Sequence, residues 1–360
     1  MIIFRYLTRE ILMTMAAVAG VLLLVIMGSR FIRYFTNAAE GEIPVSILGT
    51  LMLYHLPGFL ELILPLAFFL GILLAYGQLY LNSEIAVLVA CGTSPLRLLQ
   101  VSLVPATVVA VLVGLCSLWL TPAGALHNEQ LLEEQQSRLD FTALAPGRFQ
   151  DFGGGRTAYT EGYDDDRSHM QEVFISERQR RRDGTPESAV TRAASGYQTV
   201  DEETGSRFLV LSEGERYSVE PGRHVAERLE FATYAVRLSQ AGDRSDLESP
   251  ELVSTASLLA SDEARAQAQL QWRLSLPVMV FILTLLAMPL SRVNPRQGRF
   301  AKLLPAVFLH VCYLSLLLAA LDAIGRGALP VAVGMWPIHA AFLALGLGLM
   351  VRAQRQGMAG

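Results

Sequence analysis

Long apolar runs alternate with short polar segments along this chain, and one long polar stretch divides the runs into two groups. A helix needs roughly 20 mostly apolar residues to cross the hydrocarbon of a bilayer. Six runs meet that requirement, at residues 11–28, 48–81, 98–120, 274–290, 303–321 and 331–351. The pattern predicts a membrane α-helical protein with six transmembrane helices in a 3 + 3 arrangement.

The second run is unusually long and contains Pro57, Glu61, Pro65 and Gly71. As a straight helix it would measure about 50 Å, against a hydrocarbon core of ~30 Å. We therefore expect a kinked, tilted helix whose start lies at the membrane interface. Glu61 is either a functional residue inside the span or a solvated one near its start, and the sequence leaves both open.

The polar stretch changes from helical to strand-like periodicity. Residues 122–139 look helical, and short β-prone runs follow at 157–160, 172–176, 207–211 and 229–234. Turn-forming pairs separate these runs, among them Asp183-Gly184, Glu213-Gly214 and Pro221-Gly222. The pattern predicts an inserted all-β domain, either a sandwich or a jelly roll. A second helical stretch, capped by Ser254 or Thr255, continues to Arg273.

The expected organisation is therefore transmembrane helices 1–3 in residues 1–121, the β domain with flanking helices in 122–270, and transmembrane helices 4–6 in 271–360. If the two sheets separate at one edge, the inward-facing side chains line an apolar slot. If they close, the same side chains form an ordinary core, and alternation does not distinguish the two. The side chains expected to face inward are Val173, Ile175, Phe208 and Val210.

Charge supports this division and gives an orientation. Residues 121–270 carry a net charge of −11 and the remainder carries +7. With the N-terminus in the cytoplasm, nine basic residues flank the spans on the cytoplasmic side and four on the other. The positive-inside rule therefore predicts cytoplasmic N- and C-termini and an acidic domain outside the cytoplasm.

Rare residues exclude several kinds of enzyme. The only lysine, Lys302, has no phosphate-binding loop around it, so this chain is not itself a P-loop ATPase. No histidine pair has the spacing of a zinc protease, and we expect no metal site.

The three cysteines lie in or beside apolar segments and are expected to be buried thiols. The arginine run 178–182 is interpreted as a solvated turn rather than a nucleic-acid patch, and Asp164–Asp166 as an exposed loop.

A short apolar helix is expected between spans two and three, although this segment lies outside the membrane. Asn82 or Ser83 caps it, Gly92 ends it, and Pro95 follows. An apolar helix in water suits a groove on a partner protein. Glu84 either pairs with a basic residue of that partner or complements the helix dipole. The candidate contact residues are Ser83, Glu84, Ile85, Val87, Leu88, Cys91 and Gly92.

Several strings occur together in the order that one family shows. They are Arg5-Tyr6-Leu7-Thr8-Arg9-Glu10, Gly41-Glu42-Ile43-Pro44, Leu64-Pro65-Leu66, Ser83-Glu84-Ile85 with Ala90-Cys91-Gly92, Gln269-Leu270-Gln271-Trp272-Arg273, and Pro289-Leu290-Ser291 with Asn294-Pro295-Arg296-Gln297-Gly298-Arg299. With the topology above, they resemble the lipopolysaccharide-export permease family (LptF/LptG) along the whole chain. The opening residues and the loop at 293–299 resemble the LptF branch more than the LptG branch.

The resemblance implies a permease subunit in the bacterial inner membrane that extracts lipopolysaccharide from the outer leaflet and passes it through a periplasmic β domain. It implies three protein partners: an LptG-type second permease, a cytosolic ATPase dimer and a single-span periplasmic LptC-type protein. It also implies that this chain holds no cofactor, because ATP and Mg bind the ATPase. In the family, the segment at 83–92 is the coupling helix to the ATPase, and spans one and five border the gates through which lipid enters.

Lipopolysaccharide has phosphates and acyl chains, and each suggests a contact. Arg30 and Arg33 end span one on one helix face, where they either bind phosphate or extend to the lipid interface. The basic cluster of the family matches both positions, which favours substrate binding.

Two other functions stay open. An ion-driven transporter usually has charged sites near the membrane midplane, for which only Glu61 and Asp322 are candidates, and it would leave the large β insert unexplained. A membrane-anchored interaction protein would not need six spans.

Overall fold

The computed structural model describes residues 2–39, 45–138, 146–151, 156–164, 169–180, 186–200, 207–219, 226–239, 250–292 and 302–358. The chain forms two compact units. Met1–Leu132 with Glu248–Gly360 is called the membrane unit here, and Glu133–Leu247 is called the β unit. The units therefore divide at 132 and 248 rather than at 121 and 270, because the segments flanking the sheet pack on the spans.

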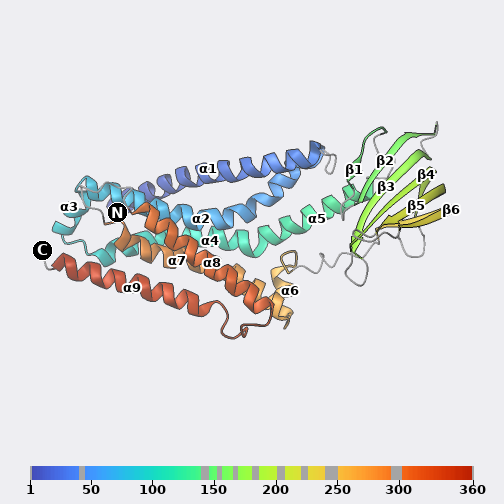
Figure 1. Ribbon diagram of the computed structural model, residues 1–360. Helices are drawn as coiled ribbons and strands as arrows, with labels where there is room; N and C mark the ends of the chain where they lie inside the picture. Colours follow the sequence, from blue (N-terminus) through green and yellow to red (C-terminus); the bar gives the residue numbers. More distant parts are fainter. Residues whose placement is uncertain are drawn as a thin grey trace. The chain divides into compact units, whose positions relative to one another are not determined.

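The membrane unit is helical, and the start of α1, the short α3 and the end of α9 lie at the same end of it (Figure 1). Six described helical segments are long and apolar enough to cross a membrane, which confirms the six expected spans. The elements are α1 (Ile2–Ala39), η1 (Val45–Ile47), α2 (Leu48–Leu81), α3 (Glu84–Ala90), α4 (Pro95–Leu115), the π-helix η2 (Cys116–Leu120), α5 (Thr121–Arg138), α6 (Thr255–Ala260), α7 (Ala264–Leu290), α8 (Leu303–Gly325) and α9 (Trp336–Met358).

Some helix bounds differ from those expected. The helical stretch before span four is two helices, since Ser254 caps α6 through a hydrogen bond from the Ser257 amide and α7 starts separately. The last span begins at Trp336 rather than at 331, because residues 331–335 form turns. Pro57 and Pro65 both lie inside α2 without ending it.

Helix α1 packs on α2 through a narrow apolar stripe. Leu7, Ile11 and Met15 are buried and lie four residues apart, so they share one face of α1. Opposite them is Gly71, where an added Cβ would lie 3.0 Å from the Met15 backbone nitrogen. Glycine therefore sets how closely the two helices approach. Much of the rest of α1 is exposed, including Leu24, at 75%.

A buried chain of neutral hydrogen bonds joins α7, α8 and α9. Ser275 Oγ donates to the Gln271 carbonyl over 2.7 Å and lies 2.9 Å from His339 Nε2. Because the serine proton is used, His339 Nε2–H donates to Ser275, and Nδ1 accepts from the Tyr313 hydroxyl at 2.6 Å. The direction of donation is the reverse of that in a nucleophilic triad. These hydrogen bonds therefore position α8 and do not activate Ser275.

The described strands of the β unit form one antiparallel sheet in which each strand pairs with its chain neighbours. The inserted β domain is confirmed. The described strands form a meander, so the two-sheet arrangement of a sandwich or jelly roll stays a prediction. They are β1 (Gln150–Asp151), β2 (Arg156–Tyr163), β3 (Met170–Arg180), β4 (Pro186–Val200), β5 (Arg207–Val219) and β6 (Ala226–Ser239). Strand β4 was not predicted, because its small and polar residues lack the bulky alternation of the other strands.

The regular alternation of inward-facing and outward-facing residues is interrupted in β3 and β5, at one residue with positive φ in each strand. Met170 and Val173 belong to one buried cluster although they are three residues apart, and Glu172 between them has φ 47°. The predicted Glu213-Gly214 turn is wrong, because both residues lie inside the continuous strand β5. Within that strand Glu213 has φ 51°. Gly214 fits there because an added Cβ would be 2.3 Å from the Arg192 carbonyl.

Candidate functional site

The acidic residue of the short helix between spans two and three is held in place. Tyr6 Oη donates to Glu84 Oε2 over 3.1 Å, and Asn82 Nδ2 donates to Glu84 Oε1 over 3.1 Å. Tyr6 also lines a hollow of about 740 Å³ with Arg5 and Arg9 of α1. The carboxylate is therefore oriented by α1 and by the end of α2 before any partner binds.

Helix α3 has one buried face and one exposed apolar face. Ile85 is 1% exposed and Leu88 packs against the core, whereas Val87 and Val89 are 61% and 48% exposed. Cys91 is a free, exposed thiol, so the expectation that it is buried is wrong. A helix that exposes valines beside an oriented carboxylate has the features of a docking surface.

The predicted helix ends are partly right. Ser83 adopts left-handed backbone geometry (φ 61°) and its side chain makes no capping bond, so the expected cap is absent. Gly92 has φ 88° and ends the helix, as glycine does at this position. Ser94 instead caps the next helix, accepting from the Arg97 amide.

Arg30 and Arg33 occupy the last third of α1. The Arg30 guanidinium lies 5.5 Å from the ring centre of Phe59 on α2, and Arg33 is exposed. Phe31 and Phe35 are exposed beside them. The structure therefore brings two cations and an apolar surface together on one helix end, the combination that a phosphorylated lipid requires.

Behind this end lies a polar cluster that the sequence analysis missed. Tyr34 Oη is 3.2 Å from His55 Nδ1, which is also 2.6 Å from Asn128 Nδ2. These residues join α1, α2 and α5. His55 in the apolar helix α2 was the available signal, because polar side chains in spans are costly unless they are paired, whereas Asn128 lies in the polar helix α5.

The two acidic candidates for ion-driven transport lie in different surroundings. Glu61 is 7% exposed and accepts a 2.7 Å hydrogen bond from Thr121 Oγ1, so it is not a solvated residue. Asp322 is exposed near the end of α8 and pairs with Arg326. They do not form one buried charged site.

The inner face of the β unit contains half of the residues predicted for it. Val173 and Ile175 lie in the buried cluster, together with Leu209 and Leu211 of β5. Phe208 and Val210 alternate with those leucines and point to the other face. The expected parity on β5 is therefore wrong, because residues 208–211 are all apolar and alternation alone does not select which pair faces inward.

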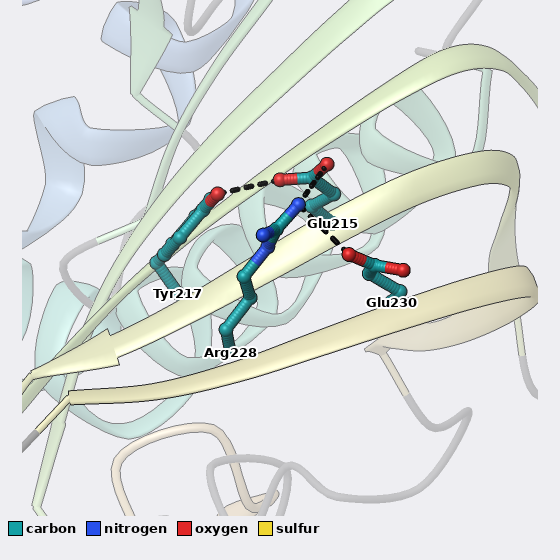
Figure 2. A network of polar contacts seen from close by, with 4 residues as sticks. All are labelled: Glu215, Tyr217, Arg228 and Glu230. Carbon is teal, nitrogen blue, oxygen red and sulfur yellow. Dashed lines mark hydrogen bonds and ion pairs between the residues drawn. The ribbon is translucent and has the colours of Figure 1, made fainter.

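The exposed side of β5 and β6 carries a charged network (Figure 2). Arg228 bridges Glu215, at 2.7 Å, and Glu230, at 2.8 Å, while Tyr217 donates to Glu215 over 2.6 Å. The hydrogen bond from Arg228 lowers the pKa of Glu215, and the bond to Glu215 raises the pKa of Tyr217. Because Glu215 and Glu230 face each other across the strands, Arg228 relieves their repulsion.

Six spans, an inserted antiparallel sheet and an exposed apolar helix with an oriented carboxylate define a multi-pass membrane protein built to work with partner chains. Sequence comparison agrees with this class. The family described as "Lipopolysaccharide export system permease LptF/LptG" matches residues 5–352. The chain is 32% identical over 350 residues to the LptF proteins of Escherichia coli K12 and Shigella flexneri, covering 97% of this chain and 94% of theirs.

The chain belongs to the LptF/LptG family of lipopolysaccharide export permeases. It is therefore a transport subunit of a membrane system rather than an enzyme.

Proposed function

We propose that this chain is the LptF-type permease subunit of an exporter that extracts lipopolysaccharide from the outer leaflet of the bacterial inner membrane. The observation that carries the proposal is α3: its valines are exposed while Tyr6 and Asn82 orient Glu84. Such a helix suits the groove of a motor protein. ATP and Mg belong to that separate ATPase dimer, and this chain itself holds no cofactor.

The other partners are a second permease of LptG type and a single-span periplasmic protein of LptC type. Apolar side chains on α1 and α8 support this proposal, because Leu24 and Leu304 are more than 70% exposed and other large hydrophobics surround them. These two helices are candidates to face the second permease and the lipid between them. The β unit then passes lipid to the periplasmic partner.

The substrate contacts follow from its chemistry. Arg30 and Arg33 bind the phosphates at the outer edge of the membrane. The acyl chains need apolar cover, because each methylene left in water costs roughly 0.8 kcal/mol. Val173 and Ile175, with Leu209 and Leu211, supply such cover in the β unit.

The orientation in this proposal places α3 and both termini in the cytoplasm and the β unit in the periplasm. Cys91 is a native probe for it, because it is exposed on the α3 side while Cys116 is buried. A membrane-impermeant maleimide should label the chain in inverted vesicles and leave it unlabelled in intact spheroplasts. Labelling of intact spheroplasts would reverse the topology.

Reconstitution tests the function. Co-expressed with the second permease and the ATPase, the chain should release lipopolysaccharide from proteoliposomes to a periplasmic acceptor only with ATP. Glu84→Arg should reduce ATPase co-purification at least tenfold. Glu263→Arg is the matched control, because Glu263 is an exposed acid preceding another helix. Lipid that stays in the vesicles of the wild-type complex despite ATP hydrolysis would refute the proposal.

The β unit is tested separately by photocrosslinking. A photoreactive residue at Val173 should capture lipopolysaccharide when ATP is present, whereas one at Phe174, its neighbour on the other face, should not. Equal capture at both positions would mean that lipid does not use the inner face.

A further inference from the structure

Both connections between the membrane unit and the β unit start from one buried polar network. The chain leaves the membrane unit through η2 and α5, and it returns at residue 248 into the segment 250–255. Side chains from α2, η2, α5, this segment and α7 meet in the network. We call it the exit–return network, and it consists of Glu61, Ser117, Thr121, Thr255 and Arg273.

Arg273 holds the returning chain. It is 2% exposed, and its Nη1 donates to Thr255 Oγ1 over 2.8 Å. Its Nη2 lies within 2.9–3.2 Å of the carbonyl oxygens of Pro250, Glu251 and Val253. One guanidinium therefore binds the five-residue segment that leads into α6 and the first residue of that helix.

The same network holds the exit. Ser117 Oγ donates to the Arg273 carbonyl over 3.2 Å, and Thr255 Oγ1 donates to the Leu118 carbonyl. Thr121, the first residue of α5, donates to Glu61 on α2. Ser117 and Leu118 lie in the π-helix, an irregular turn that often marks a functional position in a helix.

A static clamp would not need buried charges. A buried arginine and a buried glutamate are costly in membrane spans, and neutral hydrogen bonds hold α7, α8 and α9 together elsewhere in this unit. Glu61 and Arg273 also attract each other electrostatically without a direct ion pair between them. Helix α7 packs on α2, α4, α8 and α9, so a movement of the spans reaches Arg273.

We infer that Glu61 and Arg273 are positioning residues that transmit movement of α2 and α7 to both connections of the β unit. Through them, extraction of lipid between the spans is linked to its transfer into the β unit. The inference rests on the proposed function, since it assigns residues to one step of that transport.

The test separates extraction from transfer in the reconstituted full complex. A photocrosslinker at Phe31, exposed on α1, reports extraction, and one at Val173 reports arrival in the β unit. With Arg273→Gln we expect ATP hydrolysis within twofold of wild type, unchanged lipid capture at Phe31 and at least tenfold less at Val173. Arg273→Lys should restore part of the transfer, because it keeps the charge and three donors.

Two milder variants guard against misfolding. Thr255→Val removes one of the four bonds of Arg273 and should give an intermediate loss, and Glu61→Gln keeps the bond from Thr121 while removing the charge. Arg326→Gln is the control, since Arg326 is an exposed arginine at the end of α8.

If all variants change stability but leave the ratio of Val173 to Phe31 capture unaltered, the network is a static clamp and the inference fails. If the wild-type complex captures no lipid at either position, the proposed function fails first.

Discussion

The hydroxyl of Tyr6 on α1 donates a hydrogen bond to the carboxylate of Glu84 on α3, across 78 residues of sequence. The contact links the first span to the helix proposed to bind the ATPase. Helix α1 therefore contacts the docking surface directly, in addition to the bond that Asn82 at the end of α2 donates to the same carboxylate.

Tyr6→Phe should weaken this link without unfolding the chain. A hydrogen bond of this kind contributes about 1 kcal/mol, so we expect roughly fivefold weaker binding of the ATPase. The measurement is a titration of ATPase against permease complexes in nanodiscs. Tyr217→Phe removes a similar tyrosine–glutamate bond from the β unit and should leave affinity unchanged. Equal effects of both variants would show that Tyr6 does not orient Glu84.

Gly71→Ala should destabilise the membrane unit. The new Cβ would meet the Met15 backbone at 3.0 Å, and overpacking of this kind costs roughly 1–3 kcal/mol. Thermal unfolding of the purified chain in detergent should therefore begin at a lower temperature. At Gly20 on α1 an added Cβ meets nothing within 4 Å, so Gly20→Ala should be neutral or slightly stabilising. A neutral Gly71→Ala would mean that α1 and α2 separate easily.

The adjacent residues Glu213 and Gly214 in β5 give a pair of opposite predictions. Gly214→Ala would place a Cβ 2.3 Å from the Arg192 carbonyl and should open the sheet to protease. Glu213→Gly should protect it, because φ 51° is strained for glutamate and glycine relieves about 1 kcal/mol. Limited proteolysis of the full chain measures both. Gly162→Ala, where an added Cβ meets nothing within 4 Å, is the control.

The network around Arg228 predicts a pH dependence. Glu215 has a lowered pKa when folded, so its contribution to stability is present above the unfolded pKa and is lost as pH falls through the folded pKa. Tyr217 has a raised pKa, so its contribution is present below pH 10 and is lost at higher pH. Arg228→Gln should flatten the acid dependence, because the Arg228 hydrogen bond is the main cause of the lowered pKa of Glu215. It should not flatten the alkaline dependence, because the Glu215 bond raises the pKa of Tyr217 and Arg228 opposes that rise.

Protease resistance of the β unit in the full chain, compared between pH 7 and acid or alkaline conditions, measures this effect. Other acidic groups titrate as well, so only the difference between wild type and Arg228→Gln reports the network. High salt should reduce that difference, because the network is exposed and its charges are screened. Identical profiles for the two proteins would show that the network adds no stability.

The sequence predicted best where the local pattern is strong. Six apolar runs gave six spans, and the bounds of α2 were predicted without error. The short α3 was also placed correctly, because Gly92 is a local stop signal. Strand β4 was missed since Ala189, Thr191 and Ala193 are buried but small, and small residues leave no periodic signal.

Hydropathy by itself determined that this chain crosses a membrane six times around a polar insert. The free-energy cost of exposing an apolar side chain to water depends on the residue type, so it can be summed along the sequence without knowing the fold. Only the tertiary structure decided which polar groups meet. Arg273 and Thr255, Tyr6 and Glu84, and His339 and Tyr313 each lie on different helices, and their pairing depends on how the helices pack. The face of β5 that turns inward was likewise decided by the tertiary structure, because residues 208–211 are all apolar and either alternate pair could have been buried.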